Sequence, residues 1–184
     1  RMSFANRASA KVFRDKLEIP VIQGGMGVGI SMGKLAGSVA ACGGMGVIST
    51  ALIGFREEDF YQNHVEADVR ALRKEIQIAK EIANGRGMIA INAMTVTTDY
   101  RECIEAAVRE GIDAIISGAG LPLALPEIVD GKDVLIAPIV SSAKAAALIM
   151  RSWNKKCERK PDFIVVEGSG AGGHLGFKKE ELIN

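Results

Sequence analysis

Short apolar runs alternate with amphipathic stretches along the chain, and this alternation constrains the fold more than any other feature. The runs are rich in Val, Ile and Ala and lie at 21–23, 45–49, 88–92, 114–117, 134–137 and 163–166. Continuous apolar runs are typical of parallel strands covered on both faces. Between them, apolar residues such as Val69, Leu72 and Ile76 recur at helical spacing. The pattern predicts an α/β fold with six parallel strands.

Polar residues mark where the intervening helices begin. Ser31 is expected to cap a helix that runs to about residue 42, and Asp99 a helix that ends before residue 111. Glu102 stands three residues after Asp99, which is the spacing of a capping box. Ser141 or Ser142 is expected to cap an alanine-rich helix to about residue 156.

The alternation leaves two closures of the sheet open. One is an open doubly wound sheet, and the other is a (β/α)₈ barrel, which typically needs about 250 residues. Six units are too few to close a barrel. If the fold is a barrel, the 184 residues hold its first three quarters, and strands seven and eight lie outside them.

Charge and reactive side chains exclude several classes of partner. The chain has 23 Lys and Arg against 22 Asp and Glu without a basic block, which argues against nucleic acid and anionic membranes. No apolar run is long enough to cross a bilayer, and we expect a cytoplasmic protein. Cys42, Cys103 and Cys157 lack CxxC spacing and are expected to be reduced packing residues. With only His64, expected at the surface, and His174, no metal site is expected.

Glycines gather at two predicted strand ends. Nine of the 21 glycines fall between positions 24 and 46, and five fall between 168 and 176. Ligands of parallel α/β folds bind at the carboxyl ends of the strands, where glycine lets the backbone approach them closely. The first cluster is not a GxGxxG fingerprint, and the chain has no phosphate-binding GxxxxGK[ST] loop and no GxSxG elbow. Nucleotide triphosphate hydrolysis and serine hydrolysis are therefore not favoured.

His174 lies within the second cluster, between glycines just after the sixth predicted strand. Imidazole has an ordinary pKa of about 6.5, which suits proton transfer near neutrality. This context makes His174 a candidate catalytic residue, and an exposed histidine without a role is the alternative.

Four segments at successive strand ends resemble a known family. They are IPVIQGGM at 19–26, INAM at 91–94, SGAGLP at 117–122 and AGGH at 171–174. In this order they resemble the FMN-dependent nitronate monooxygenases, formerly called 2-nitropropane dioxygenases, and their relatives, the flavin-dependent enoyl-ACP reductases. The resemblance implies a TIM (β/α)₈ barrel with FMN across its C-terminal mouth. We expect residues 1–184 to form a single FMN-binding domain that is incomplete at its C-terminus.

The resemblance also implies roles for individual residues. The backbone of Gly24, Gly25, Met26 and Gly27 would lie against the isoalloxazine, and Asn92 would hydrogen-bond the flavin. Glu167, Gly172 and Gly173 would line the ring and the ribityl chain, and His174 would face the substrate as base or orienting group. The implied reaction oxidises an alkyl nitronate with O2 to a carbonyl compound and nitrite, with the redox chemistry carried by FMN.

Two departures from the family pattern point in opposite directions. Glu167 stands where many of these monooxygenases have glutamine, which favours the reductase branch, whereas the turn at 140–143 resembles the monooxygenases. The alternatives are therefore an NAD(P)H-dependent enoyl thioester reductase and a truncated ligand-binding domain without catalysis. A partial barrel also exposes strand edges, which further chain or a second copy in a homodimer would cover.

Overall fold

Helices and strands alternate along the chain in the computed structural model, which describes residues 13 and 15–172. The elements are α2 (Gly33–Ala41), β1 (Met45–Ser49), α3 (His64–Ala83), β2 (Met88–Met94), α4 (Tyr100–Arg109), β3 (Ala114–Gly118), α5 (Leu125–Ile128), β4 (Leu135–Val140), α6 (Ala143–Cys157) and β5 (Val165–Val166). The strands match five of the six predicted runs, with ends that differ by at most three residues. The α/β fold predicted from the alternation is confirmed.

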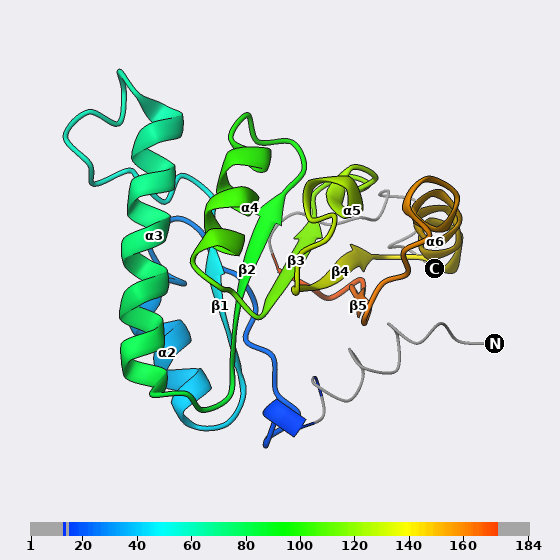
Figure 1. Ribbon diagram of the computed structural model, residues 1–184, viewed down its shortest axis with the longest axis horizontal. Coiled ribbons are helices and arrows are strands. Elements are labelled where there is room, and N and C mark those ends of the chain that lie inside the picture. Colours follow the sequence, from blue (N-terminus) through cyan, green and yellow to red (C-terminus); the bar gives the residue numbers. More distant parts are fainter. Residues whose placement is uncertain (1–12, 14, 173–184) are drawn as a thin grey trace.

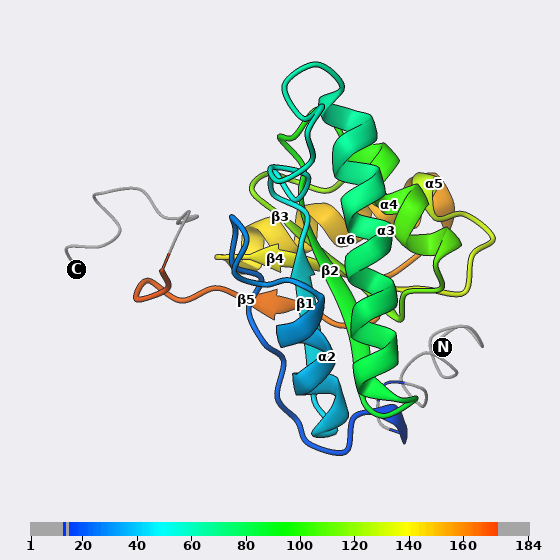
Figure 2. The same ribbon diagram turned by 90° about the vertical axis from the view of Figure 1, so that its left-hand side faces the viewer.

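All the named strands are parallel, and their order in the sheet is their order in the chain, β1-β2-β3-β4-β5. In a doubly wound sheet the order of the strands reverses at a switch point. The order of the described strands shows no such reversal. The sheet instead curls progressively from β1 to β5 (Figures 1 and 2). It is a half-barrel, which decides between the two closures in favour of the TIM barrel.

The predicted strand at 21–23 is reduced to a single bridge. Ile22 pairs with Met45 at the edge of β1 in parallel orientation. Met45 N donates to Val21 O (2.9 Å), and Gln23 N donates to Met45 O (3.0 Å). The first predicted strand therefore lies beside β1, although it does not continue as a ladder.

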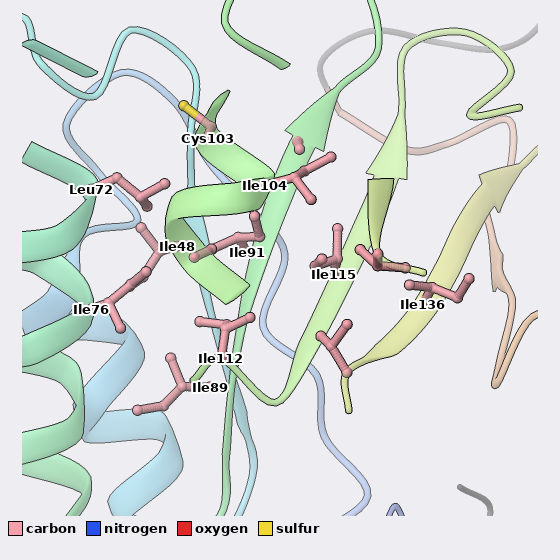
Figure 3. Close-up of a cluster of buried hydrophobic side chains, with 14 of the residues drawn as sticks. Ile48, Leu72, Ile76, Ile89, Ile91, Cys103, Ile104, Ile112, Ile115 and Ile136 are labelled. Atoms are coloured by element: carbon pink, nitrogen blue, oxygen red, sulfur yellow. The ribbon is translucent and has the colours of Figure 1, made fainter. Parts of the chain in front are cut away.

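Each face of the sheet packs a separate apolar core. The outer face carries Ile48, Ile91, Ile115 and Ile136, which pack under the helices with partners such as Leu72 of α3 (Figure 3). The inner face carries smaller side chains on average, and these form the interior of the half-barrel: Met45, Val47, Met88, Ala90, Ala114, Ile116, Leu135 and Ala137. Because side chains alternate between faces along a strand, one set anchors the helices and the other lines the barrel.

The N-terminal residues that the structure describes, 13 and 15–17, lie at the amino ends of the strands. Phe13 and Leu17 pack against the inner core, and the ring of Phe13 lies 5.0 Å from that of Phe163. Lys16 pairs with Asp113 at 2.6 Å, at the turn that leads into β3. The carboxyl ends of the strands lie at the opposite end of the half-barrel.

Two of the predicted helix caps are wrong. Helix α2 begins after Met32, and the Ser31 side chain makes no capping bond because its Oγ accepts a hydrogen bond from Met26 N (2.9 Å). Asp99 does precede α4, but its carboxylate accepts from Cys103 Sγ (3.0 Å) and caps no backbone amide, so the capping box predicted with Glu102 does not form. In both cases another nearby group takes the oxygen that the cap would use.

The cap predicted for the alanine-rich helix is confirmed. Ser142 Oγ accepts from Ala145 N at the start of α6 (3.2 Å). Across the described residues, the structure contains no helix that is both long and apolar enough to cross a bilayer.

Candidate functional site

Polar and small side chains replace the apolar inner core at the carboxyl ends of the strands. Two residues beyond Val47, Ala90, Ile116 and Val165, on the same face, stand Ser49, Asn92, Gly118 and Glu167. The register pairs Ser49 with Asn92, and β5 continues β4 through the bond from Glu167 N to Val140 O (2.8 Å). The mouth of the half-barrel is therefore lined by groups that can bind a polar ligand.

The glycine-rich loop at 24–27 lies across the ends of β1 and β2. A Cβ atom added to Gly25 would lie 2.5 Å from Asn92 Cβ, and one added to Gly27 would lie 3.0 Å from Ala51 Cβ. A Cβ at Gly24 would meet nothing within 4 Å. Glycine is thus required where the loop touches the strand ends, and at Gly24 the backbone faces open space.

Side-chain hydrogen bonds hold this loop in place. Gln23 Nε2 donates to Val47 O (3.1 Å), and Val47 N donates to Gln23 Oε1 (3.2 Å). These two bonds resemble the ones that a neighbouring strand would make, which explains why the strand at 21–23 stops after one bridge. Gln23 Nε2 also donates to the buried Ser31 Oγ (2.7 Å), the same oxygen that accepts from Met26 N.

Asn92 is half-buried beside this loop and is free to bind a ligand. Its backbone carbonyl accepts from both Thr50 N (3.0 Å) and Thr50 Oγ1 (3.2 Å), which fixes the end of β2. Within the part of the chain that the structure describes, its side-chain amide has no hydrogen-bond partner. Asn92 therefore offers a donor and an acceptor beside Gly25 and next to the open position at Gly24.

Buried side chains on the helix side hold the segment at 117–122. Ser117 Oγ donates to Ala93 O (3.0 Å) and lies 2.8 Å from the Tyr100 hydroxyl, which must then donate to it. Burial raises the pKa of Tyr100 to about 12, so this phenol stays protonated. Trp153 Nε1 donates to Pro122 O (2.9 Å). These contacts make the motif a rigid strand end, with its side chains engaged away from the mouth.

Two of the remaining predicted site residues, Glu167 and Gly172, follow β5 in the described part of the chain. Glu167 is half-buried there, and Gly172 is exposed at the end of the described residues. Gly173 and His174 lie outside the described residues. The structure thus brings Gly25 into contact with Asn92, and places Glu167 on the same inner face three strands away in the sheet.

The described residues fit a flat, partly apolar and partly polar ring. Gly24 presents open backbone, the Met26 side chain is 45% exposed, and Asn92 supplies an unpaired amide. The clustering of glycines indicated Gly24, and the resemblance added Met26 and Asn92. The sequence analysis missed Gln23 and Ser31 as the residues that hold the loop. The only feature of the sequence that could indicate Gln23 and Ser31 is that they are polar residues among apolar residues and glycines. This feature is weak, because polar residues are common in such loops.

A family model described as nitronate monooxygenase matches residues 10–184. The chain belongs to the nitronate monooxygenase family. Its four strand-end motifs therefore belong to a known barrel family, as the sequence implied.

Solved structures show the same fold. FabK from Thermotoga maritima matches with a TM-score of 0.68 and 23% identity over 90% of this chain and 46% of its own. A single-residue variant of that protein gives the same TM-score and identity, with 48% of its own chain covered. This nitronate monooxygenase family chain thus spans about half the length of the structures that it matches. A comparison with curated proteins finds no significant match.

Proposed function

We propose that the protein is an FMN-dependent oxidoreductase that oxidises alkyl nitronates with O2 to a carbonyl compound and nitrite. The observation that carries the proposal is the contact between Gly25 and Asn92, which places an unpaired amide beside the glycine loop, next to the open position at Gly24. Membership of the nitronate monooxygenase family supports it. FMN, when bound, would supply the redox chemistry and the protein its position and electrostatics.

The chain's own residues would bind the ring from three sides. The backbone at 24–27 would lie against its flat face, because the absence of side chains at the glycines permits close approach. Asn92 would donate to and accept from the polar edge of the ring. Glu167, Gly172 and Gly173 would line the remaining edge and the ribityl chain.

His174 would act on the substrate. A neutral imidazole can accept the proton that a nitroalkane loses from the carbon next to the nitro group, and an imidazolium can hold the anionic oxygens of the nitronate. Either role needs a position beside the ring, which the glycines on both sides of the Gly173-His174 segment would permit.

The first experiment is the visible absorption spectrum of the purified protein together with its intact mass. We expect a flavin spectrum, and nitronate consumption that depends on FMN and falls strongly in His174→Ala. Full activity in that variant would contradict the role of His174. A protein that stays colourless after FMN is added would contradict the flavin site and favour a ligand-binding domain without catalysis.

The Asn92 contact has its own test. Asn92→Ala removes the unpaired amide, and loss of a hydrogen bond of about 1.4 kcal/mol corresponds to a tenfold weaker FMN affinity. Asn154→Ala is the matched control, because it makes the same change at an exposed position of α6. Equal FMN affinity in the two variants would remove Asn92 from the site.

Glu167 favours a second candidate, an NAD(P)H-dependent enoyl thioester reductase. An ionised carboxylate next to the ring disfavours additional negative charge on it. FabK, a solved structure that this chain resembles, matches it in fold. The reductase predicts rapid flavin reduction by NADH or NADPH and little use of nitronate. Rapid reduction by nitronate and slow reduction by both nucleotides would exclude it.

Three further features stay predictions from the sequence. These are a single FMN-binding domain over residues 1–184, a cytoplasmic location and a homodimer. The exposed Val166 at the edge of β5 is compatible with covering by a second copy or by further chain. Sedimentation of the purified protein measures the oligomeric state directly.

A further inference from the structure

A cluster of three ionisable side chains lies on the helix side of the sheet. His64 is the first residue of α3, Asp68 lies one turn later, and Asp99 immediately precedes α4. One nitrogen or oxygen from each side chain lies within 4.8 Å of the other two. Asp68 is fully buried and Asp99 is 2% exposed, so these carboxyl groups are part of the interior.

One of the two buried carboxyl groups, that of Asp68, has an oxygen without a hydrogen-bond partner. Asp68 Oδ1 accepts from Gly54 N (2.5 Å), and Asp99 Oδ2 accepts from Cys103 Sγ (3.0 Å). Asp68 Oδ2 is buried without a hydrogen-bond partner. Among the described residues, no lysine or arginine forms an ion pair with either aspartate. A buried charge without a partner is costly, so the cluster calls for a positive charge.

His64 is positioned to bind a cation together with the unpartnered Asp68 Oδ2. His64 Nδ1 lies 3.4 Å from Asp68 Oδ2. Two ligand atoms on a tetrahedral zinc ion, each about 2.0 to 2.1 Å from the metal, are separated by roughly 3.4 Å. The imidazole is held in this direction by an edge contact with the Phe60 ring, at 5.1 Å between centroids.

We propose that His64, Asp68 and Asp99 form a binding site for a divalent cation of the zinc type. One nitrogen and two carboxylate oxygens make a ligand set that Zn²⁺ accepts, with a water molecule in the fourth position. The His64 side chain is 35% exposed, which gives an ion a path from solvent. The amide of Gly54 and the thiol of Cys103 hold the carboxylates through their other contacts and act as positioning groups.

The site would join three segments, two that follow β1 and one that follows β2. Gly54 belongs to the loop after β1, His64 and Asp68 to the start of α3, and Asp99 to the start of α4. An ion bound here would fasten the β1–α3 loop to both helices. Because an ion that binds only the folded state stabilises it by mass action, it would raise the unfolding temperature without entering the flavin site.

The test is titration of the purified, chelator-treated protein with Zn²⁺ alone, followed by calorimetry and thermal unfolding. We expect one equivalent to bind and to raise the unfolding midpoint. His64→Gln and Asp68→Asn should each weaken binding at least tenfold. Glu66→Gln is the matched control, since it removes an exposed carboxylate from the same turn of α3, and it should bind as the parent does.

Co²⁺ provides a second measurement, because its visible absorption reports the geometry and type of its ligands. We expect bands of a four- or five-coordinate ion with nitrogen and oxygen ligands, and their loss in His64→Gln. Absence of binding, equal binding in all variants, or a thiolate charge-transfer band would overturn the proposal. If no ion binds, a proton shared by Asp68 and Asp99 neutralises the pair instead. Neither measurement depends on flavin.

Discussion

Replacement of Gly25 by alanine tests the contact on which the candidate site depends. The added methyl group would lie 2.5 Å from Asn92 Cβ, whereas two carbon atoms in favourable contact are about 3.5 to 4.0 Å apart. Asn92 Cβ is attached to the backbone of β2 and cannot rotate away. The loop must therefore withdraw by about 1 Å.

This withdrawal would break hydrogen bonds that hold the loop. The bonds from Met26 N to Ser31 Oγ and from Ser31 N to Met26 O are both 2.9 Å long, and a further 1 Å takes them beyond the useful range of about 3.2 Å. At about 1 kcal/mol for each bond, plus overpacking, we expect the free energy of unfolding to fall by about 1–3 kcal/mol. The unfolding midpoint should fall by about 2–4 °C for each kcal/mol.

The assay is thermal unfolding of the flavin-free protein, with Gly24→Ala as the matched control. A methyl group at Gly24 meets nothing within 4 Å, so its stability should stay within about 0.5 kcal/mol of the parent. Gly24→Ala should nevertheless weaken FMN binding, because its methyl group occupies the open space in front of the backbone. Equal stability of the two variants would refute the reasoning that the Asn92 contact requires glycine.

Three further predictions concern buried polar groups. Trp153→Phe leaves Pro122 O without its donor and should cost about 1–3 kcal/mol in urea unfolding, and an unchanged midpoint would contradict the role of this bond. Tyr100→Phe removes the donor to Ser117 Oγ and should cost about 1 kcal/mol without changing the absorption of bound flavin. Burial, with the nearby charge of Asp99, raises the pKa of Asp68 from 3.8 to about 6, so the metal-free folded chain retains a proton that the unfolded chain releases. The stabilisation that comes from this retained proton is full below about pH 4 and is lost as the pH rises to about 6. The free energy of unfolding should fall over this range by at most about 3 kcal/mol. Urea unfolding of Asp68→Asn in chelator should not show this loss, and parallel pH profiles of variant and parent would contradict it.

The fold was predictable because hydrophobic periodicity is a local signal. Five of the runs form strands, and Val69, Leu72 and Ile76 lie on the predicted helix that became α3. Periodicity could not choose between an open sheet and a barrel, because strand order depends on contacts between distant segments. The resemblance of the four motifs made that choice correctly.

The side-chain contacts that hold the site were not predictable, because hydrophobic periodicity does not indicate which polar groups will pair. The Gln23 amide takes the place of a strand beside Val47, and nothing in the run at 21–23 indicates that its ladder should end. Ser31 and Asp99 were expected to cap helices, because a local bond is the default for such residues. Other nearby groups, Met26 N and Cys103 Sγ, took their oxygens instead. The packing of α3 against α4 placed Asp99 beside His64 and Asp68, which periodicity could not indicate.

The two faces of the sheet divide structural support from ligand binding. On the outer face, large side chains such as Trp153 and Tyr100 pack tightly and hydrogen-bond strand ends, so the backbone at the mouth is fixed from behind. On the inner face, the small Ala90 is followed by the polar Asn92, and Gly118 ends β3. The mouth therefore has both free space and polar groups. Because the support comes from behind, Glu167 can be changed without disturbing the packing that positions Asn92. Glu167→Gln is therefore the substitution that separates the two candidate reactions: it should alter the preference for nitronate over NAD(P)H while leaving the unfolding midpoint within about 2 °C.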